Sequence, residues 1–578
     1  MLNRHFNLRH ASALFERKVL GTTWQVIASL LIALSWLLPN HYVPWSTFHT
    51  DAMMAVGLTL IASWVVLTTL RIPSDWHWSS FAIAMIALIP IIQYAVGLIP
   101  FWGVAWINSA YLIGLLLSLL VGQKWEKLSP DECFDVIFLA VGIGSLVSMY
   151  IALHQLLRLE SLELWVMQMN SPRVGANLGQ PNQLASLLAL GMLASCWAYI
   201  RGRMSGLIAT VLAGFFLLGV AITQSRTGWL NVTILLVMMQ FWALRSKSKS
   251  ISAASIMLAL FFVICILGVT PFIDWIMSEH STLLDGRLDI GQRPLAWKLF
   301  SDALQQRPVW GFGWGQIAIA QFQMATRYPY LGGIFFHSHN FFLDLALWNG
   351  LPIALIITAA IMWCCVIAGR RIKNAGDFVC LLFLAVLGIH AMLEFPLHYA
   401  YFLLPFGLIA GAVTARLQLT PAVTWSGWSL LAVLSLTTAV LAVTIHDYLL
   451  VETSFNQLRF EKARIGRAKD SRPPEVFVLT QLREMIRFAR VDPYAKFQPN
   501  ELNGMRQIVQ AMPSSYAMQK LATALAINGE PKEAGVWMER LCRTSPTDQC
   551  DNARNSWSQQ ASKYVAIAAV GWPTDKRK

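Results

Sequence analysis

Charged residues are scarce in this chain of 578 residues: Asp, Glu, Lys and Arg make up 13% of the positions, against 56% for apolar residues. A typical soluble domain carries about twice that share of charge. The composition therefore excludes an ordinary water-soluble protein and indicates a membrane protein with many apolar segments.

The chain also lacks the short motifs of the commonest nucleotide and hydrolase sites. It contains no Walker phosphate loop, no dinucleotide-binding glycine fingerprint and no serine elbow. No Cys/His spacing is typical of zinc, and no paired acidic motif would hold a divalent metal with a nucleotide sugar. The sequence therefore predicts no metal and no cofactor, and nothing in it indicates nucleic acid binding.

Long apolar stretches are abundant, by contrast, and they predict an all-α, polytopic membrane bundle of about 12–13 spans. The stretches cover residues about 21–38, 51–70, 79–99, 103–121, 132–156, 182–200, 205–222, 226–244, 251–271, 341–368, 377–393, 398–417 and 427–446. The first one follows a basic leader, and no small-residue cleavage site comes after it. We therefore expect it to remain as an uncleaved span.

Basic residues set the orientation, because Lys and Arg accumulate in the cytoplasmic connections of membrane proteins. They concentrate in alternate connections, which we assign to the inner side together with the N-terminus: Lys124, Lys127, Arg201, Arg203, Arg245, Lys247, Lys249, Arg370, Arg371 and Lys373. This orientation puts a large central loop, about residues 272–340, on the outer side. The C-terminal tail lies on the outer side too.

The chain divides by composition into two parts. Residues 1–446 hold the apolar stretches and the central loop, and we expect them to form the transmembrane domain. Residues 447–578 are polar, basic and long enough for a small helical domain. Within them, Leu521 to Ala534 has the spacing of one tetratricopeptide-like hairpin. A single repeat leaves an ordinary helical hairpin equally open.

Four polar clusters fall on the outer side. They are residues 285–350, 173–182, 223–227 and 390–399. Arg226 and Glu394 lie beside the ends of apolar stretches, where a charge is costly unless it is paired or used. Snorkelling or an internal Arg–Glu pair would explain either charge alone. Four clusters on one face favour a single site at the outer lipid–water boundary.

Short motifs follow one another in order through the outer connections. They are Pro39-Asn40-His41-Tyr42 with Pro44-Trp45, Gly179-Gln180-Pro181-Asn182, Ser225-Arg226-Thr227, Arg293–Trp297, Gly311-Phe312-Gly313, Ser338-His339-Asn340, and Glu394-Phe395-Pro396-Leu397 with Tyr399. The chain thereby resembles the O-antigen ligase/polymerase superfamily of bacterial envelope glycan enzymes. Its fuller set of motifs is similar to PglL-type protein O-oligosaccharyltransferases, which modify pilins and other exported proteins.

The resemblance implies a glycosyltransferase of the bacterial inner membrane whose active site, central loop and C-terminal domain are periplasmic. It implies en bloc transfer of a preassembled glycan from undecaprenyl pyrophosphate to a serine or threonine of an exported protein, without metal or nucleotide. An O-antigen ligase or a glycan polymerase would use a sugar acceptor instead. A transporter of lipid-linked glycan is a weaker alternative, because it would need polar residues deep along several spans.

The polar residues suit this chemistry. The resemblance assigns the family's functional histidine to His339, and a neutral histidine can take the proton of an acceptor hydroxyl near neutral pH. We expect no essential role for His337. Guanidinium groups bind phosphate through two donors, so the expected ligands of the donor pyrophosphate are Arg226, Arg293 and Arg173. Further contacts to glycan or donor are expected from Gln180, Asn182, Glu394 and Tyr399.

Two cysteines remain to be explained. Six of the eight cysteines lie in or beside apolar stretches, where they serve as apolar filler. Cys542 and Cys550 are the only pair on the outer, oxidising side, and a short loop joins them. We expect them to form a disulfide worth about 2–3 kcal/mol. Two free thiols are the alternative.

Overall fold

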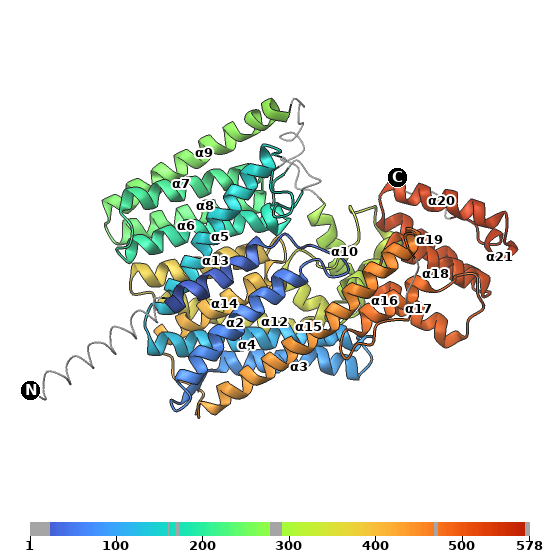
Figure 1. Cartoon of the computed structure of the whole chain (residues 1–578), viewed down its shortest axis with the longest axis horizontal. Helices are drawn as coiled ribbons and strands as arrows, with labels where there is room; N and C mark the ends of the chain where they lie inside the picture. The colour runs from blue at the N-terminus through green and yellow to red at the C-terminus, as the bar shows by residue number, and fades with distance from the viewer. Residues whose placement is uncertain (1–22, 160, 169–172, 278–291, 467–471, 573–578) are drawn as a thin grey trace, which may run out of the picture.

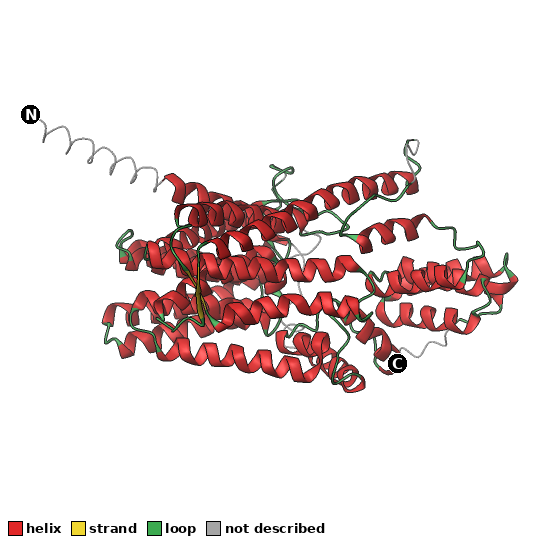
Figure 2. Ribbon diagram, turned by 90° about the horizontal axis from the view of Figure 1, so that it is seen from below, coloured by secondary structure: helices red, strands yellow, loops and turns green. Residues whose placement is uncertain are grey.

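The computed structural model describes residues 23–159, 161–168, 173–277, 292–466 and 472–572. Nearly all regular structure in this part of the chain is α-helical. The long helices run side by side in one bundle, and the C-terminal helices extend beyond one end of it (Figures 1 and 2). The part of the predicted central loop over residues 278–291 lies outside the described residues.

Among the described residues, nine helices are long and apolar enough to cross a membrane. They are α2 (Phe48–Thr68), α3 (Trp78–Ala95), α4 (Trp102–Leu128), α5 (Glu132–Leu156), α6 (Pro181–Ile200), α8 (Arg226–Arg245), α9 (Lys249–Met277), α12 (Phe341–Arg370) and α15 (Trp428–Lys462). Shorter apolar helices are Thr23–Leu37, α7 (Gly206–Ile222), α13 (Ala375–Ala391) and α14 (Ala400–Arg416). Each predicted span coincides with one of these helices, so the prediction of a polytopic all-α membrane protein is confirmed.

Small residues let the central helices α4 and α14 approach closely. A Cβ atom added to Gly122 of α4 would lie 2.1 Å from the carbonyl oxygen of Leu408, and one added to Gly411 of α14 would lie 2.0 Å from that of Leu119. Close backbone approach at small residues is the usual way in which membrane helices gain packing energy without a hydrophobic driving force. These contacts fix α14, whose first residue follows the polar segment 390–399.

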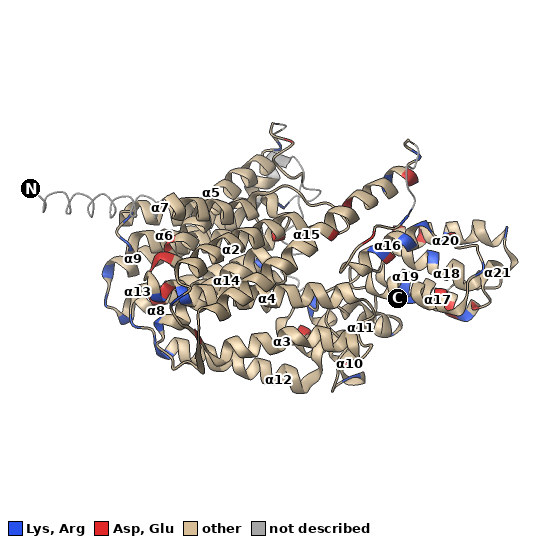
Figure 3. Ribbon diagram, turned by 60° about the horizontal axis from the view of Figure 1, so that its bottom comes forward, with Lys and Arg blue, Asp and Glu red and all other residues tan. Residues whose placement is uncertain are grey.

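The end of the bundle away from the tail is cross-linked by ion pairs. Arg416, the last residue of α14, pairs with Glu126, Asp131 and Asp377, which belong to three different helices or connections. Basic side chains gather around the same end of the bundle (Figure 3). An α-helix rises about 1.5 Å per residue, so α14 separates this end from residues 390–399 by about 25 Å.

Two short strands close the same end. They are β1 (Ser74–Trp76) and β2 (Val423–Trp425), which pair antiparallel with Ser74 opposite Trp425. Lys127 pairs with Asp75 of β1, and Lys124 donates hydrogen bonds to the backbone carbonyls of Ile72 and Pro73. The connections before α3 and before α15 are therefore tied to the end of α4.

The central loop folds back onto the bundle. Its helices are α10 (Arg293–Gln306), α11 (Ile317–Met324) and the 3-10 turn η2 (Ala325–Arg327). Between α10 and α11 the backbone is irregular, as the glycine-rich sequence predicts, and Gly311 and Gly313 have φ of 65° and 95°. The amide of Phe312 donates a hydrogen bond to the carbonyl of Leu347 at 2.6 Å, which ties this turn to α12.

The tail begins within a helix that starts in the bundle, because α15 runs unbroken past residue 446 to Lys462. The buried carboxylate of Asp447 accepts backbone hydrogen bonds from Phe477, Val478 and Leu479. These hydrogen bonds hold residues 477–479, the segment just before the first tail helix, against α15. The tail helices are α16 (Thr480–Arg490), α17 (Pro499–Ala511), α18 (Ser515–Ile527), α19 (Pro531–Thr544), α20 (Thr547–Ala561) and α21 (Val565–Ala568).

The tail packs against the central loop. Its apolar core, which includes Trp537 and Leu521, also contains Phe322 of α11 and Phe101 before α4. Helices α18 and α19 form the hairpin expected from the sequence, with Gly529 at φ 86° in the turn. The structure joins the two cysteines of this region, at the end of α19 and in α20, as a disulfide.

Candidate active site

The polar clusters meet on one buried carboxylate at the tail side of the bundle. Glu394 lies between α13 and α14, and its side chain is 5% exposed. Its Oε2 atom lies 2.9 Å from His339 Nδ1. Its Oε1 atom accepts a hydrogen bond from Asn182 Nδ2 at 2.9 Å and forms an ion pair with Arg293. Segments more than 200 residues apart in the sequence therefore converge on Glu394.

The turn that carries His339 is held by its neighbours. Asn340 caps α12, and its side chain accepts a hydrogen bond from the amide of Leu343 at 3.1 Å. Trp297 Nε1 donates to the carbonyl of Ser338 at 3.0 Å. His339 itself has φ of 59°, a left-handed conformation that is costly for a side chain other than glycine. Capping and the tryptophan contact stabilise that conformation and direct the imidazole to Glu394.

The contact with Glu394 determines which imidazole nitrogen can act as a base. Burial alone would raise the pKa of Glu394, but the hydrogen bond from His339 and the nearby positive charge of Arg293 outweigh it and lower the pKa. The ionised carboxylate can only accept hydrogen bonds. His339 Nδ1 therefore donates, and Nε2 of the neutral ring keeps a lone pair for a proton from a substrate.

Asn182 links Glu394 to the other clusters. Its Oδ1 atom accepts a hydrogen bond from Ser225 Oγ at 2.7 Å and from Arg173 Nη2 at 3.3 Å. Arg173 Nε also donates to the carbonyl of Thr223 at 3.2 Å. Ser225 is the N-cap of α8, and Arg226 follows it as the exposed first residue of that helix. Arg173, Asn182 and the start of α8 thus form one connected group beside Glu394.

The remaining predicted site residues lie at the edge of this group. Gln180 precedes α6, and its side chain is half-buried. The ring of Tyr399 stacks on that of Tyr401 at a centroid distance of 5.1 Å and lines the same cavity as His339. In the described part of the chain, neither Gln180 nor Tyr399 is hydrogen-bonded to Glu394 or His339. The clusters suggested one shared site, but sequence reasoning missed Glu394 as its centre.

A large cavity adjoins the polar group. It has a volume of about 1890 Å³ and extends between α12 and the helices α3, α4, α13 and α14. Most of its lining is apolar, whereas His337, His339, His398 and Tyr399 supply polar side chains at the tail side. Only 6% of the apolar window of α12 is buried, so this helix leaves one wall of the cavity loosely packed.

His337 belongs to a different group from His339. Its ring contacts that of His398 at a centroid distance of 3.9 Å, and its Nδ1 atom lies 3.8 Å from Asp344 Oδ2. The ring of Phe395 contacts both His337 and His339, at centroid distances of 4.4 and 5.2 Å. The two histidines of the His-Ser-His turn therefore share an aromatic neighbour but have different carboxylate partners, Asp344 for His337 and Glu394 for His339.

Three models of known protein families match segments of this chain. Residues 174–197 match the family described as "Protein glycosylation ligase", residues 208–358 match "O-Antigen ligase", and residues 378–560 match "Virulence factor membrane-bound polymerase, C-terminal". These three segments contain Asn182, Arg226, His339 and Glu394.

Two relatives from Acinetobacter baylyi (strain ATCC 33305 / BD413 / ADP1) are similar to the chain. A "General O-oligosaccharyltransferase" is 28% identical over 579 residues, which cover 97% of this chain and 99% of the relative. A "ComP-specific O-oligosaccharyltransferase" is 28% identical over 390 residues, which cover 66% of this chain and 69% of the relative. The predicted resemblance and the prediction of a glycosyltransferase are thereby confirmed.

Proposed function

We propose that this glycosyltransferase transfers a preassembled glycan en bloc from undecaprenyl pyrophosphate to a serine or threonine of an exported protein such as a pilin. The site faces the periplasm from the bacterial inner membrane, and the chemistry needs no metal. The observation that carries the proposal is the position of His339, which contacts Glu394, at the polar end of a large apolar cavity.

The cavity suits a lipid-linked donor. Its apolar walls between α12 and α14 can take a polyprenyl chain, and the loose packing of α12 gives that chain a lateral entry from the bilayer. The pyrophosphate then lies at the tail side, beside Arg226 and Arg173. The N-terminus of α8 adds backbone N–H groups and the positive end of the helix dipole, which favour anion binding.

The transfer step follows from the orientation of His339. Nε2 takes the proton of the acceptor hydroxyl while that oxygen attacks the anomeric carbon of the glycan. The bond between the anomeric carbon and the pyrophosphate oxygen breaks, and the electron pair leaves with the pyrophosphate. Glu394 stabilises the imidazolium that forms, because its negatively charged carboxylate accepts a hydrogen bond from Nδ1–H throughout. We therefore assign Glu394 as a positioning residue and no longer as a glycan contact.

The tail supports a protein acceptor. A second cavity of about 580 Å³ lies between Gly333 and Ile334 of the central loop and the tail residues Ser515, Gln519 and Asn552. Its hydroxyl and amide groups can bind the backbone of an extended polypeptide. Gly333 precedes the His-Ser-His turn by only a few residues, so an acceptor segment bound there comes close to His339.

A reconstituted assay tests the proposal. The purified protein in detergent receives a lipid-linked oligosaccharide and, in separate reactions, an exported acceptor protein, lipid A core and a second lipid-linked glycan. Intact-mass analysis should show one whole glycan added to the protein. Exclusive transfer to lipid A core or to the second glycan would instead establish the ligase or polymerase reaction. A product that forms only with added Mg²⁺ would refute the metal-free chemistry, because Mg²⁺ prefers sites made of oxygen ligands alone.

A further inference from the structure

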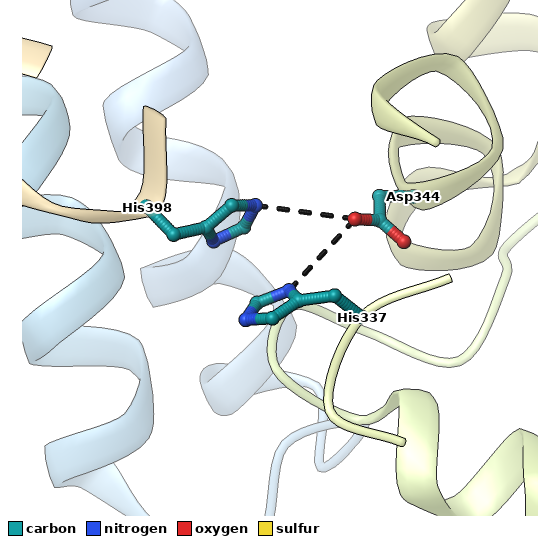
Figure 4. A group of neighbouring side chains, drawn as sticks. All are labelled: His337, Asp344 and His398. Carbon is teal, nitrogen blue, oxygen red and sulfur yellow. Dashed lines mark ion pairs between the residues drawn. The ribbon is translucent and has the colours of Figure 1, made fainter. Parts of the chain in front are cut away.

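Three side chains beside the active site converge on one point, and the proposed transfer step uses none of them (Figure 4). His337 lies in the turn before α12, Asp344 in the first turn of α12, and His398 at the end of the 3-10 turn η3 (Pro396–His398). His337 Nδ1 and His398 Nε2 lie 3.8 and 3.9 Å from Asp344 Oδ2. One ligand-type atom from each side chain lies within 4.8 Å of the other two.

Hydrogen bonding does not account for this arrangement. Both distances to Asp344 Oδ2 are too long for hydrogen bonds. Asp344 is 1% exposed. Its other oxygen, Oδ1, accepts a hydrogen bond from the backbone N–H of Ser338, with an N to Oδ1 distance of 2.7 Å. His337 Nδ1 is buried and has no hydrogen-bond partner in the described structure. A buried nitrogen without a hydrogen-bond partner destabilises the folded protein. A cation bound between the three side chains would give that nitrogen a partner.

The ligand set favours zinc. Zinc binds imidazole nitrogen at about 2.0–2.1 Å and carboxylate oxygen at about 2.0–2.2 Å, usually in a tetrahedron. Ligand atoms of such a tetrahedron lie about 3.4 Å apart, so each histidine needs to approach Asp344 by only about half an ångström. Magnesium and calcium prefer oxygen ligands alone, whereas imidazoles suit zinc and its neighbours among the transition metals.

We propose that His337, Asp344 and His398 bind one Zn²⁺ ion. Three protein ligands leave a fourth position for water, and both histidines line the large cavity. The ion joins the His-Ser-His turn to α12 and to η3, so it restrains the turn that carries His339. His339 and Glu394 contribute no ligand to this site, so the ion takes no direct part in the proposed transfer step.

Metal binding to the purified full-length protein tests this site. After removal of metal with a chelator, the protein in detergent is titrated with Co²⁺, whose visible absorption distinguishes tetrahedral from octahedral coordination. We expect one Co²⁺ per chain with a tetrahedral spectrum, its displacement by one equivalent of Zn²⁺, and a higher Tm with Zn²⁺. These readouts do not depend on a donor or on transfer activity.

Ligand variants locate the ion. Asp344→Asn keeps the acceptor for the Ser338 amide, and His337→Gln alters a side chain whose Nδ1 has no partner, so both should fold. Each should weaken Zn²⁺ binding at least about 100-fold, because loss of even an outer partner costs 10- to 100-fold. His49→Gln is the matched control, since His49 pairs with Glu452 elsewhere. No tetrahedral Co²⁺ signal, or a signal unchanged in both variants, would overturn the proposal.

Discussion

Replacing Glu394 with glutamine tests the proposed role of His339 most directly, because it changes one atom of a buried group. Arg293 and Asn182 both donate to the Oε1 position, so the amide oxygen of glutamine must take that position. The NH₂ group is then left at the Oε2 position, facing His339 Nδ1. It can only donate there, which forces Nδ1 to accept and puts the proton of the imidazole on Nε2.

The expected loss follows from the tautomer. A His339 ring with its proton on Nε2 cannot take the proton of the acceptor hydroxyl. General base catalysis contributes about 10²- to 10⁴-fold to a rate, so Glu394→Gln should lower kcat by that factor, or raise the barrier by about 3–5 kcal/mol. The fold should lose only about 1–2 kcal/mol, because Arg293 is 29% exposed and water screens its unpaired charge.

Single-turnover transfer with enzyme in excess over donor separates chemistry from binding. The matched control is Glu452→Gln. Glu452 forms a similar pair with His49, with Oε1 lying 2.9 Å from His49 Nε2, and this pair is not part of the Glu394 group. The control should transfer glycan at the parent rate. A Glu394→Gln protein that is folded, binds donor and transfers glycan within threefold of the parent rate would refute the assignment of His339 as the base.

Four further outcomes are expected. His339→Ala should abolish transfer in the purified assay while expression and membrane insertion persist, whereas His337→Ala should retain measurable activity. Arg226→Lys should weaken donor binding, seen as a raised KM for the lipid-linked glycan, because an ammonium cannot bind phosphate through two fixed donors. Serine at both Cys542 and Cys550 should lower the free energy of unfolding of the tail by about 2–3 kcal/mol, and peptide mapping without reductant should find the two cysteines linked in the parent. A reporter that is active only in the cytoplasm should be silent when fused to the C-terminus, and an active fusion would contradict a periplasmic tail.

The membrane helices could be predicted from sequence because the signal is local. A continuous apolar window is enough to identify a span, and every predicted stretch overlaps one helix of the structure, with ends that differ by a few residues. The prediction was less accurate for the end of the last helix, which was expected at about residue 446. Polar residues follow residue 446, yet α15 continues to Lys462 because Tyr448 and Val451 stay buried against Phe48 and the tail.

The connections within the site were harder to predict because they depend on packing. The motifs identified His339, Asn182 and Glu394 separately, but the pairing of Glu394 with His339 requires the end of α13 to meet the start of α12. Sequence reasoning considered an internal pair between Arg226 and Glu394, whereas the structure pairs Glu394 with Arg293. Both arginines lie in segments that the sequence assigns to the same side of the membrane, and only their positions in space distinguish them.

The zinc site that we propose around His337 departs from the sequence-based expectation of no metal, which stays a prediction. The sequence predicted no metal because no Cys/His spacing was typical of zinc. Short spacings of that kind arise when ligands share one hairpin or helix, but here the three side chains come from a turn, a helix and a connection that are brought together only by the bundle. Asp344 and His398 are 54 positions apart in the sequence, so no local pattern could indicate their contact.

The structures of the two ends of the bundle favour an enzyme that works at one membrane surface, and they do not favour a transporter. A transporter must open toward each side in turn. Here the end away from the tail is closed by Arg416, which joins Glu126, Asp131 and Asp377, and by the β1–β2 pair. Opening that end would break several partly buried ion pairs at once. The polar group around Glu394 lies about 25 Å away, at the other end of α14. A fixed end away from the tail and a polar site at the tail end suit a reaction that brings its lipid donor in from the side and its acceptor from the tail.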